Sequence, residues 1–157
     1  MGYMQRREAA LTADSEEGNQ PTPANQQATQ LRGTSMATIL FVEDHVDSLR
    51  LMTRLLSGAG YEVIPAASLA EARQLASTTP IDLLISDLGL PDGSGADLLR
   101  GLLHANGSKP NGLKAIAISG YDMEEDLRRS REAGFVRHVT KPVNFDVLME
   151  TIRELLG

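Results

Sequence analysis

The stretch from Ile81 to Gly93 constrains the fold more than any other part of the chain. It begins as a run rich in Leu and Ile, which is typical of a strand buried on both faces. The run ends at Asp87, and glycine, proline and aspartate residues follow at once and break it. In an open parallel sheet, ligands bind beyond the carboxyl ends of the strands. Asp87 is therefore either a residue that only caps a turn or a functional carboxylate, and the other strand ends decide between these interpretations.

Apolar runs alternate with helical patterns from Met36 to the end of the chain. The expected strands cover residues 38–42, 61–65, 81–87, 113–118 and 135–140. The expected helices run from Asp47 to Gly58 or Gly60, from Ser68 to before Pro80, from Gly95 to about Ala105, from Glu124 to about Ala133, and from Asn144 onward. This alternation predicts an α/β fold, with a doubly wound parallel sheet of five strands and five helices on its two faces. Both doubly wound strand orders are compatible with this pattern, and for five strands we expect the flavodoxin-like order 2-1-3-4-5.

Local signals place the ends of three helices. Ser68 and Glu71 have the spacing of a capping box. Asp47 and Asn144 are the expected N-caps of the first and last helices. The residues expected to face inward on the last helix are Val147, Leu148, Ile152, Leu155 and Leu156.

Residues 1–35 differ in composition from the rest of the chain. Gln, Asn, Thr, Ala, Pro, Glu and Ser dominate, and such a segment cannot bury enough apolar surface to offset its ordering entropy. We therefore expect a disordered tail or linker at 1–35 and one globular domain at 36–157. The tail is either a tether to a partner or upstream domain, or a dispensable extension.

Composition narrows the classes of function. The formal net charge of −6 argues against nucleic-acid binding, which needs a basic surface. The chain has no cysteine, which excludes disulfides, thiolate nucleophiles and cysteine-based zinc sites. No apolar stretch has the length of a membrane helix, and no secretory signal opens the chain. We therefore expect a cytoplasmic protein that binds neither nucleic acid nor membrane.

Functional side chains follow four of the five expected strands. Glu43 and Asp44 end the first strand, Asp87 the third, Ser119 the fourth and Lys141 the fifth. Each alone has a simple structural explanation, as a cap, a turn residue or a solvated charge. Together they predict one site, because the carboxyl ends of parallel strands meet at the same edge.

The chemistry of these groups indicates phosphoryl transfer. Three carboxylates this close need a cation, and oxygen donors without His or Cys suit Mg²⁺. A carboxylate can attack phosphorus and form an acyl phosphate. Mg²⁺, the Lys141 ammonium and the Ser119 hydroxyl can each neutralise or bind one phosphoryl oxygen. Lys141 also precedes Pro142, where a cis peptide bond costs little.

Four motifs resemble the receiver domain of two-component response regulators, and the resemblance covers about residues 37–157. They are Val42-Glu43-Asp44, Asp87 with Leu90-Pro91-Asp92-Gly93, Ile118-Ser119-Gly120 and Lys141-Pro142. The resemblance implies that Asp87 accepts a phosphoryl group from a phosphohistidine of a histidine kinase or histidine phosphotransfer protein.

The resemblance also implies roles for the neighbouring groups. Asp44, Asp87 and the Gly89 carbonyl are expected to bind Mg²⁺ directly, and Glu43 largely through water. Ser119 and Lys141 are expected to contact the phosphoryl group.

A conformational switch is part of what the resemblance implies. In the family, the hydroxyl after the fourth strand moves toward the phosphate, and an aromatic residue on the fifth strand turns inward behind it. The hydroxyl here is that of Ser119, and His138 takes the place of the aromatic residue, as in receivers attached to hybrid histidine kinases. His138 either turns inward in the same way or is a surface residue of the strand.

The chain ends at Gly157, just after the last expected helix, so we expect no output domain. The protein is then not an enzyme, apart from catalysing its own phosphorylation and dephosphorylation. The expected contact face, which also allows a homodimer, is formed by the helix 124–133, the strand 135–140 and the last helix. The arginines at 128, 129 and 131 on this face either meet an acidic partner or are a solvated surface, and we favour the second interpretation.

Two alternatives remain open at this point. One is an interaction module with the receiver fold that works without phosphorylation. The other is a Mg²⁺-dependent phosphatase of the haloacid dehalogenase type. Such enzymes carry a second aspartate two residues after the nucleophile, where this chain has Gly89.

Overall fold

A computed structural model describes residues 36–106, 112–120 and 124–157. The compact unit runs from Ala37 to Gly157. The tail predicted at 1–35 lies outside the described residues, so the division into tail and globular domain stays a prediction.

The main sheet has five parallel strands in the order β2-β1-β3-β6-β7, which confirms the expected flavodoxin-like order. Its strands are β1 (Thr38–Val42), β2 (Glu62–Ala66), β3 (Leu83–Asp87), β6 (Lys114–Ser119) and β7 (Arg137–Thr140). The last strand is shorter than the predicted 135–140, since it begins at Arg137 and leaves Phe135 and Val136 outside the strand. A second, antiparallel pair, β4 (Gly89–Leu90) and β5 (Gly93–Ser94), was not expected from the sequence. These two-residue strands are too short to show an alternating pattern.

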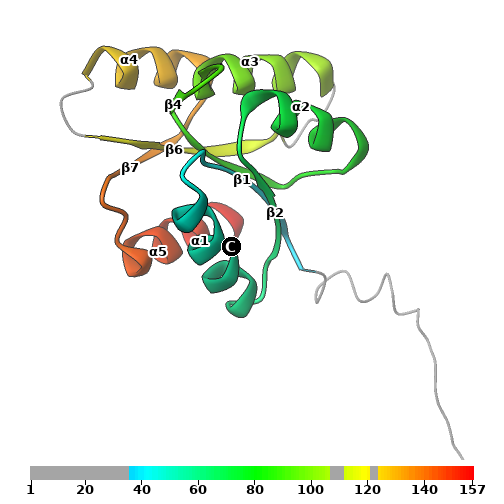
Figure 1. Cartoon of the computed structure of the whole chain (residues 1–157), viewed down its shortest axis with the longest axis vertical. Coiled ribbons are helices and arrows are strands. Elements are labelled where there is room, and N and C mark those ends of the chain that lie inside the picture. The colour runs from blue at the N-terminus through cyan, green and yellow to red at the C-terminus, as the bar shows by residue number, and fades with distance from the viewer. Residues whose placement is uncertain (1–35, 107–111, 121–123) are drawn as a thin grey trace, which may run out of the picture. The chain divides into compact units, whose positions relative to one another are not determined.

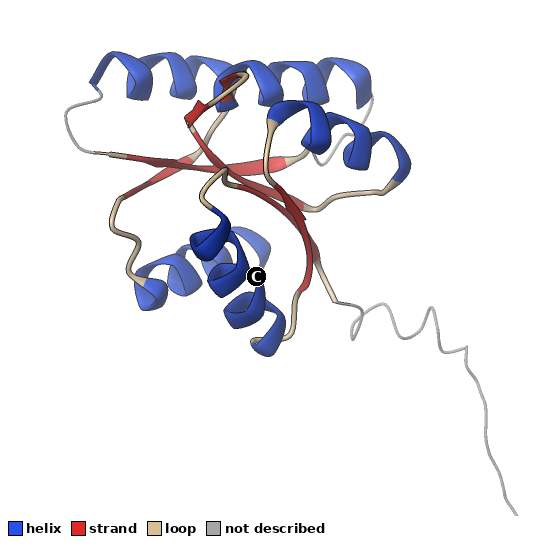
Figure 2. Ribbon diagram, in the orientation of Figure 1, coloured by secondary structure: helices blue, strands red, loops and turns tan. Residues whose placement is uncertain are grey.

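Helices cover both faces of the sheet (Figures 1 and 2). They are α1 (Val46–Gly58), α2 (Leu69–Thr78), α3 (Gly95–Asn106), α4 (Glu124–Ala133) and α5 (Phe145–Leu156). In Figure 1, α1 and α5 lie below the sheet, and α2, α3 and α4 lie above it. The α/β doubly wound architecture predicted from the sequence is therefore confirmed.

The core has two layers, one on each face of the sheet. Successive side chains of a strand point to opposite faces. In β1, Ile39 and Phe41 therefore pack with α1 and α5, whereas Leu40 and Val42 pack with α2 and α3. All five residues of β3 are buried. This burial on both faces explains why the central strands read as continuous apolar runs.

Two of the predicted helix caps are confirmed. The Ser68 hydroxyl accepts a hydrogen bond from the Glu71 N–H at 3.1 Å and starts α2. The Asn144 side chain accepts one from the Val147 N–H at 3.1 Å and starts α5. Both caps satisfy N–H groups that the first helical turn leaves without a partner.

The prediction that Asp47 caps α1 is wrong, because His45 does so. The Nδ1 atom of His45 accepts a hydrogen bond from the Ser48 N–H at 3.3 Å, and the Leu49 N–H bonds to the His45 carbonyl at 2.9 Å. The helix thus begins two residues earlier than expected, and Asp47 lies inside its first turn, where an acidic residue is favourable.

The prediction that Val147 faces inward on α5 is also wrong. Its side chain is 51% exposed, whereas Leu148, Met149 and Ile152 are buried. Leu155 and Leu156 are half-buried and pack against the same core. The apolar residues of α5 cover more than one side of the helix, so the pattern alone did not decide which of them face the sheet.

Candidate functional site

Three carboxylates meet where β1 and β3 end. These strands are neighbours in the sheet, which brings Glu43 and Asp44 next to Asp87. One carboxylate oxygen from each residue lies within 4.8 Å of the others. Glu43 and Asp87 are buried, whereas Asp44 is exposed. The His45 N–H donates to Oε2 of Glu43 at 2.9 Å and orients this buried side chain.

Both carboxylate oxygens of Asp87 are hydrogen-bonded. The Gly89 N–H donates to Oδ1 at 3.0 Å, and the Lys141 ammonium donates to Oδ2 at 2.5 Å. Lys141 also lies 3.4 Å from Oε1 of Glu43. Burial by itself lowers the pKa of Lys141, but the hydrogen bond and charge of Asp87, with the charge of Glu43, outweigh it and raise the pKa above its usual value. A protonated lysine therefore offsets part of the negative charge at this site.

Ser119 ends the strand next to β3. The register pairs Asp87 with Ile118, so Ser119 is the next residue along that strand, and it is buried. Its carbonyl accepts a hydrogen bond from the Lys141 N–H at 2.7 Å, which ties the ends of β6 and β7 together. The Lys141–Pro142 peptide bond is cis, as the sequence suggested.

The loop after Asp87 is anchored at two points that sequence reasoning missed. The Asp92 carboxylate accepts hydrogen bonds from the N–H groups of Leu69, at 2.9 Å, and Ala70, at 3.1 Å, at the start of α2. The bond from Leu69 is the largest cause that lowers the pKa of Asp92. In sequence, Asp92 reads only as a turn residue, because its partners lie more than 20 residues away.

The second anchor is the close approach of Gly95 to the end of β3. A Cβ atom at Gly95 would lie 2.5 Å from the Asp87 carbonyl oxygen and 2.8 Å from the Ser86 hydroxyl. Only glycine fits here without displacing the backbone beside the central carboxylate. Gly95, the first residue of α3, thus packs directly against the backbone of Asp87.

His138 is a half-buried residue of β7, and its side chain contacts α4. Its Nε2 atom is hydrogen-bonded to the hydroxyl of Ser130, which is fully buried on α4. Burial, and secondarily the charge of Arg131, lower the pKa of His138. Ser130 was not singled out in the sequence. Ser130 and Ala133 are the two buried residues of this strongly charged helix, and they lie three residues apart. This helical spacing was the available signal that Ser130 faces inward.

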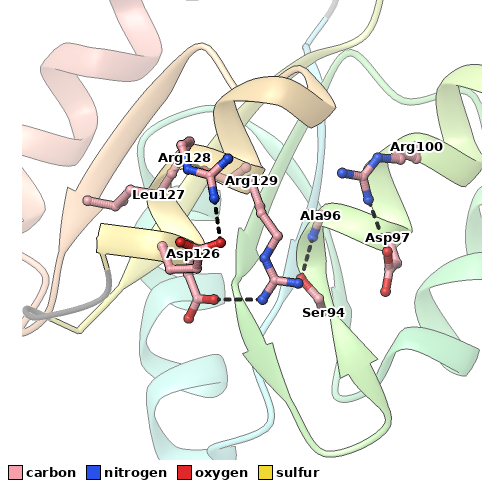
Figure 3. Close-up of polar contacts among 10 residues, drawn as sticks. Ser94, Ala96, Asp97, Arg100, Asp126, Leu127, Arg128 and Arg129 are labelled. Carbon is pink, nitrogen blue, oxygen red and sulfur yellow. Dashed lines mark hydrogen bonds and ion pairs between the residues drawn. The ribbon is translucent and has the colours of Figure 1, made fainter.

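The outer face of α4 carries ion pairs within the helix. Arg128 pairs with Glu125 at 2.5 Å and with Glu132 at 3.4 Å. Arg129 points to Asp126 at 3.1 Å (Figure 3). These exposed pairs support the interpretation of a solvated face rather than of an arginine cluster that needs an acidic partner.

An open pocket of about 510 Å³ adjoins the carboxylates. Its floor includes the apolar side chains of Phe41, Met52 and Ile118, and its rim includes Asp44 and Lys141.

The donor set of the cluster fits a hard divalent cation. Its three members offer carboxylate oxygens, which Mg²⁺ prefers, and Asp44 is exposed to the water that Mg²⁺ retains. The Gly89 backbone is two residues from Asp87 and is bonded to it, so its carbonyl belongs to the same turn. Within the described residues, no helix combines the length and apolar character needed to span a membrane.

The sequence of this chain matches a known protein family. The family profile described as "Response regulator receiver domain" matches residues 39–153. The polar-differentiation response regulator DivK of Brucella ovis is 30% identical over 120 residues, which are 76% of this chain and 96% of DivK.

Solved structures agree with this match. A CheY-like receiver domain protein from Methanospirillum hungatei JF-1 aligns with a TM-score of 0.70 and 32% identity, over 76% of this chain and 93% of that one. The chemotaxis response regulator CheY4 of Vibrio cholerae aligns with a TM-score of 0.71 and 25% identity, over 78% of this chain and 100% of that one.

Proposed function

This chain belongs to the response regulator receiver family of two-component signalling, and from this premise we propose that Asp87 is its phosphoacceptor. Receiver domains are signalling proteins rather than conventional enzymes. The donor is a phosphohistidine of a histidine kinase or histidine phosphotransfer protein. In the transfer, the P–N bond of the phosphohistidine breaks as a carboxylate oxygen of Asp87 forms a bond to phosphorus, and the released imidazole takes up a proton.

The observation that carries this proposal is the set of contacts around Asp87. Its carboxylate ends a buried strand, receives hydrogen bonds on both oxygens, and lies beside two further carboxylates and a lysine. Lys141 is positioned to bind an oxygen of the transferred group, because it already contacts Asp87 Oδ2. Ser119, at the adjacent strand end, is the proposed second contact to the phosphoryl oxygens.

We assign Mg²⁺ binding to Asp44, Asp87 and the Gly89 carbonyl, with Glu43 acting largely through water. The bound ion supplies positive charge that offsets the charge on the phosphoryl oxygens. Glu43 keeps its orientation through the His45 N–H and Lys141. This arrangement leaves Asp44 as the exposed ligand.

Phosphorylation is proposed to act on other proteins through the face formed by α4, β7 and α5. Ser119 and His138 are the proposed switch residues. The same face is the proposed interface if the phosphorylated protein dimerises. Because Arg128 and Arg129 pair within their own helix, we expect contacts there to depend on shape and on exposed apolar side chains such as Val147 of α5 and Val136, which precedes β7.

The intact mass after incubation with acetyl phosphate tests the phosphoacceptor. We expect one phosphoryl adduct on the wild type that requires Mg²⁺ and is absent from Asp87→Asn. Asp82→Asn is the matched control, because Asp82 lies just before the other end of the same strand, where it accepts a hydrogen bond from the Thr38 N–H at 2.8 Å. Failure of a folded, Mg²⁺-binding wild type to form the adduct, or an adduct that survives in Asp87→Asn, would contradict the proposal.

A further inference from the structure

An open groove of about 520 Å³ lies between α1 and the end of β2, and we call it the α1–β2 groove. Its apolar lining comes from Val46 and Leu49 of α1, from Pro65 of β2, and from Ala67, which follows β2. None of the described residues lines both this groove and the pocket beside the carboxylates. The groove is therefore a second concave surface of α1, separate from the carboxylate site.

The contribution of α1 to the groove is one continuous side of the helix. Five residues line the groove with the i, i+3, i+4, i+7, i+8 spacing of a single helix face, and they are Val46, Leu49, Arg50, Thr53 and Arg54. The Val46 side chain is 53% exposed, and Pro65 is exposed as well. The apolar part of the groove is thus open to solvent and accessible to another molecule.

Two exposed arginines one turn apart give this side of the groove its positive charge. Within the described part of the chain, Arg50 and Arg54 form no ion pair, not even with Asp47 in the first turn of the same helix. On α4, by contrast, Arg128 and Arg129 pair with acidic residues of their own helix. Like charges four residues apart destabilise a helix when nothing offsets them. The two arginines of α1 are therefore available to the carboxylates of a partner, which a guanidinium binds through two parallel hydrogen bonds.

Glu71 of α2 restricts which anion fits the groove. Glu71 also lines the groove, and its Oε1 atom accepts a hydrogen bond from the Ala67 N–H at 2.8 Å, which holds the carboxylate in place. Nucleic acids and anionic membranes need an extended basic surface, and Glu71 and the formal net charge of −6 both disfavour them. A partner with apolar side chains and with carboxylates along one edge only fits the lining and the charges together.

We propose that the α1–β2 groove binds an acidic amphipathic helix of a partner protein. The apolar face of this helix covers Val46 and Pro65, and two of its carboxylates bind Arg50 and Arg54. Acidic residues four positions apart on a helix have the same spacing as these two arginines, so both pairs form together. The edge that meets Glu71 carries no acidic residue. This interaction goes beyond the proposed function, because no lining residue belongs to the carboxylate cluster.

A fluorescein-labelled peptide of about 14 residues, or four helical turns, tests the groove when the full chain is titrated into it. The peptide has leucines on one helical face, glutamates four residues apart along one edge of that face, and glutamines along the other edge. We expect a saturable rise in fluorescence anisotropy that weakens as KCl is added. The same peptide with lysines in place of the glutamates should not bind. No binding of the glutamate peptide, or equal binding of the lysine peptide, would overturn the proposal.

Two double variants locate the peptide on the protein. Arg50→Gln with Arg54→Gln should raise the Kd about tenfold, the factor expected from two lost ion pairs at an exposed surface. Arg128→Gln with Arg129→Gln is the matched control, because it removes the same charge from another helix, and it should leave the Kd unchanged. Equal Kd values for the two double variants would contradict the role of the arginines and with it the proposal.

The apolar contact has a test of its own in Val46→Ser. This variant should raise the Kd about threefold, because a side chain that is 53% exposed has only part of its surface left for a partner to gain. An unchanged Kd would show that the peptide does not lie on the apolar lining.

Asp87→Asn and lipid vesicles separate the groove from other sites and other anions. Asp87→Asn should bind the glutamate peptide as the wild type does, whether or not Asp87 is a phosphoacceptor. Loss of binding in this variant would place the peptide at the carboxylate cluster instead of the groove. Phosphatidylglycerol vesicles should not bind the wild type, and vesicle binding that Arg50→Gln with Arg54→Gln removes would assign the arginines to a lipid surface and overturn the protein partner.

Discussion

At the scale of single residues, the site depends on side chains that anchor backbone far from them in sequence. Asp92 is exposed, yet it holds the N-terminus of α2 through the N–H groups of Leu69 and Ala70. The loop that carries Asp92 also follows Asp87, the proposed phosphoacceptor, directly. The Asp92 carboxylate thus links the position of that loop to α2.

The contribution of Asp92 to stability should depend on pH. Because the pKa of Asp92 is lowered in the folded state, the stabilisation is present above the unfolded value of about 4 and is lost as pH falls through the folded value. We expect Asp92→Asn to have a lower urea midpoint than the wild type at pH 7, and the difference to shrink below about pH 4.

Asp97→Asn is the control for this pH dependence. Asp97 is an exposed carboxylate whose contact is with Arg100 in its own helix at 3.1 Å (Figure 3), so its replacement should leave the urea midpoint nearly unchanged. A difference between Asp92→Asn and the wild type that stays constant across the whole pH range would rule out this role of the charge.

At the scale of elements, each helix stabilises the fold through the face that it turns to the sheet. In α5, Ile152 is fully buried, whereas Val147 is half exposed. We expect Ile152→Ala to lower the free energy of unfolding by about 2–5 kcal/mol, since it leaves a cavity. Val147→Ala should change it by less than about 0.5 kcal/mol, since it removes little buried surface. Urea denaturation measures both values, and equal losses would show that α5 is rotated from the orientation described.

At the scale of the whole molecule, we expect the proposed Mg²⁺ site at the carboxylate cluster to couple ion binding to folding. A ligand that binds only the folded protein stabilises it by mass action, by about 2.7 kcal/mol at a hundredfold excess over Kd. We therefore expect Mg²⁺ to raise the melting temperature of the wild type, and a chelator to reverse the effect. KCl at equal ionic strength controls for screening of the net charge of −6.

Asp44→Asn should abolish the Mg²⁺-dependent rise in melting temperature. Asp47→Asn is its matched control, because Asp47 is an exposed carboxylate three residues away that does not belong to the cluster. If Asp44→Asn kept the full rise, or if Asp47→Asn lost it, the ion would not be bound at the cluster.

The sequence alone predicted the alternation of strands and helices, the caps at Ser68 and Asn144, and the strand ends that carry Glu43, Asp87 and Lys141. These features are local, since the period of apolar residues and the chemistry of a cap depend on residues close together in the chain. The pattern was compatible with both doubly wound strand orders, and the flavodoxin-like order was preferred because the sheet has five strands.

Only the tertiary structure decided which side chains meet across the sheet. The sequence predicted that Lys141 and Asp87 share one edge of the sheet, but it did not show that Asp92 caps a helix more than 20 positions before it or that Ser130 bonds to His138 from another element. The orientation of Val147 belongs to the same class, because it depends on how α5 packs on the sheet. Such contacts depend on the register and crossing of packed elements, and the pattern of residues within one element does not record these.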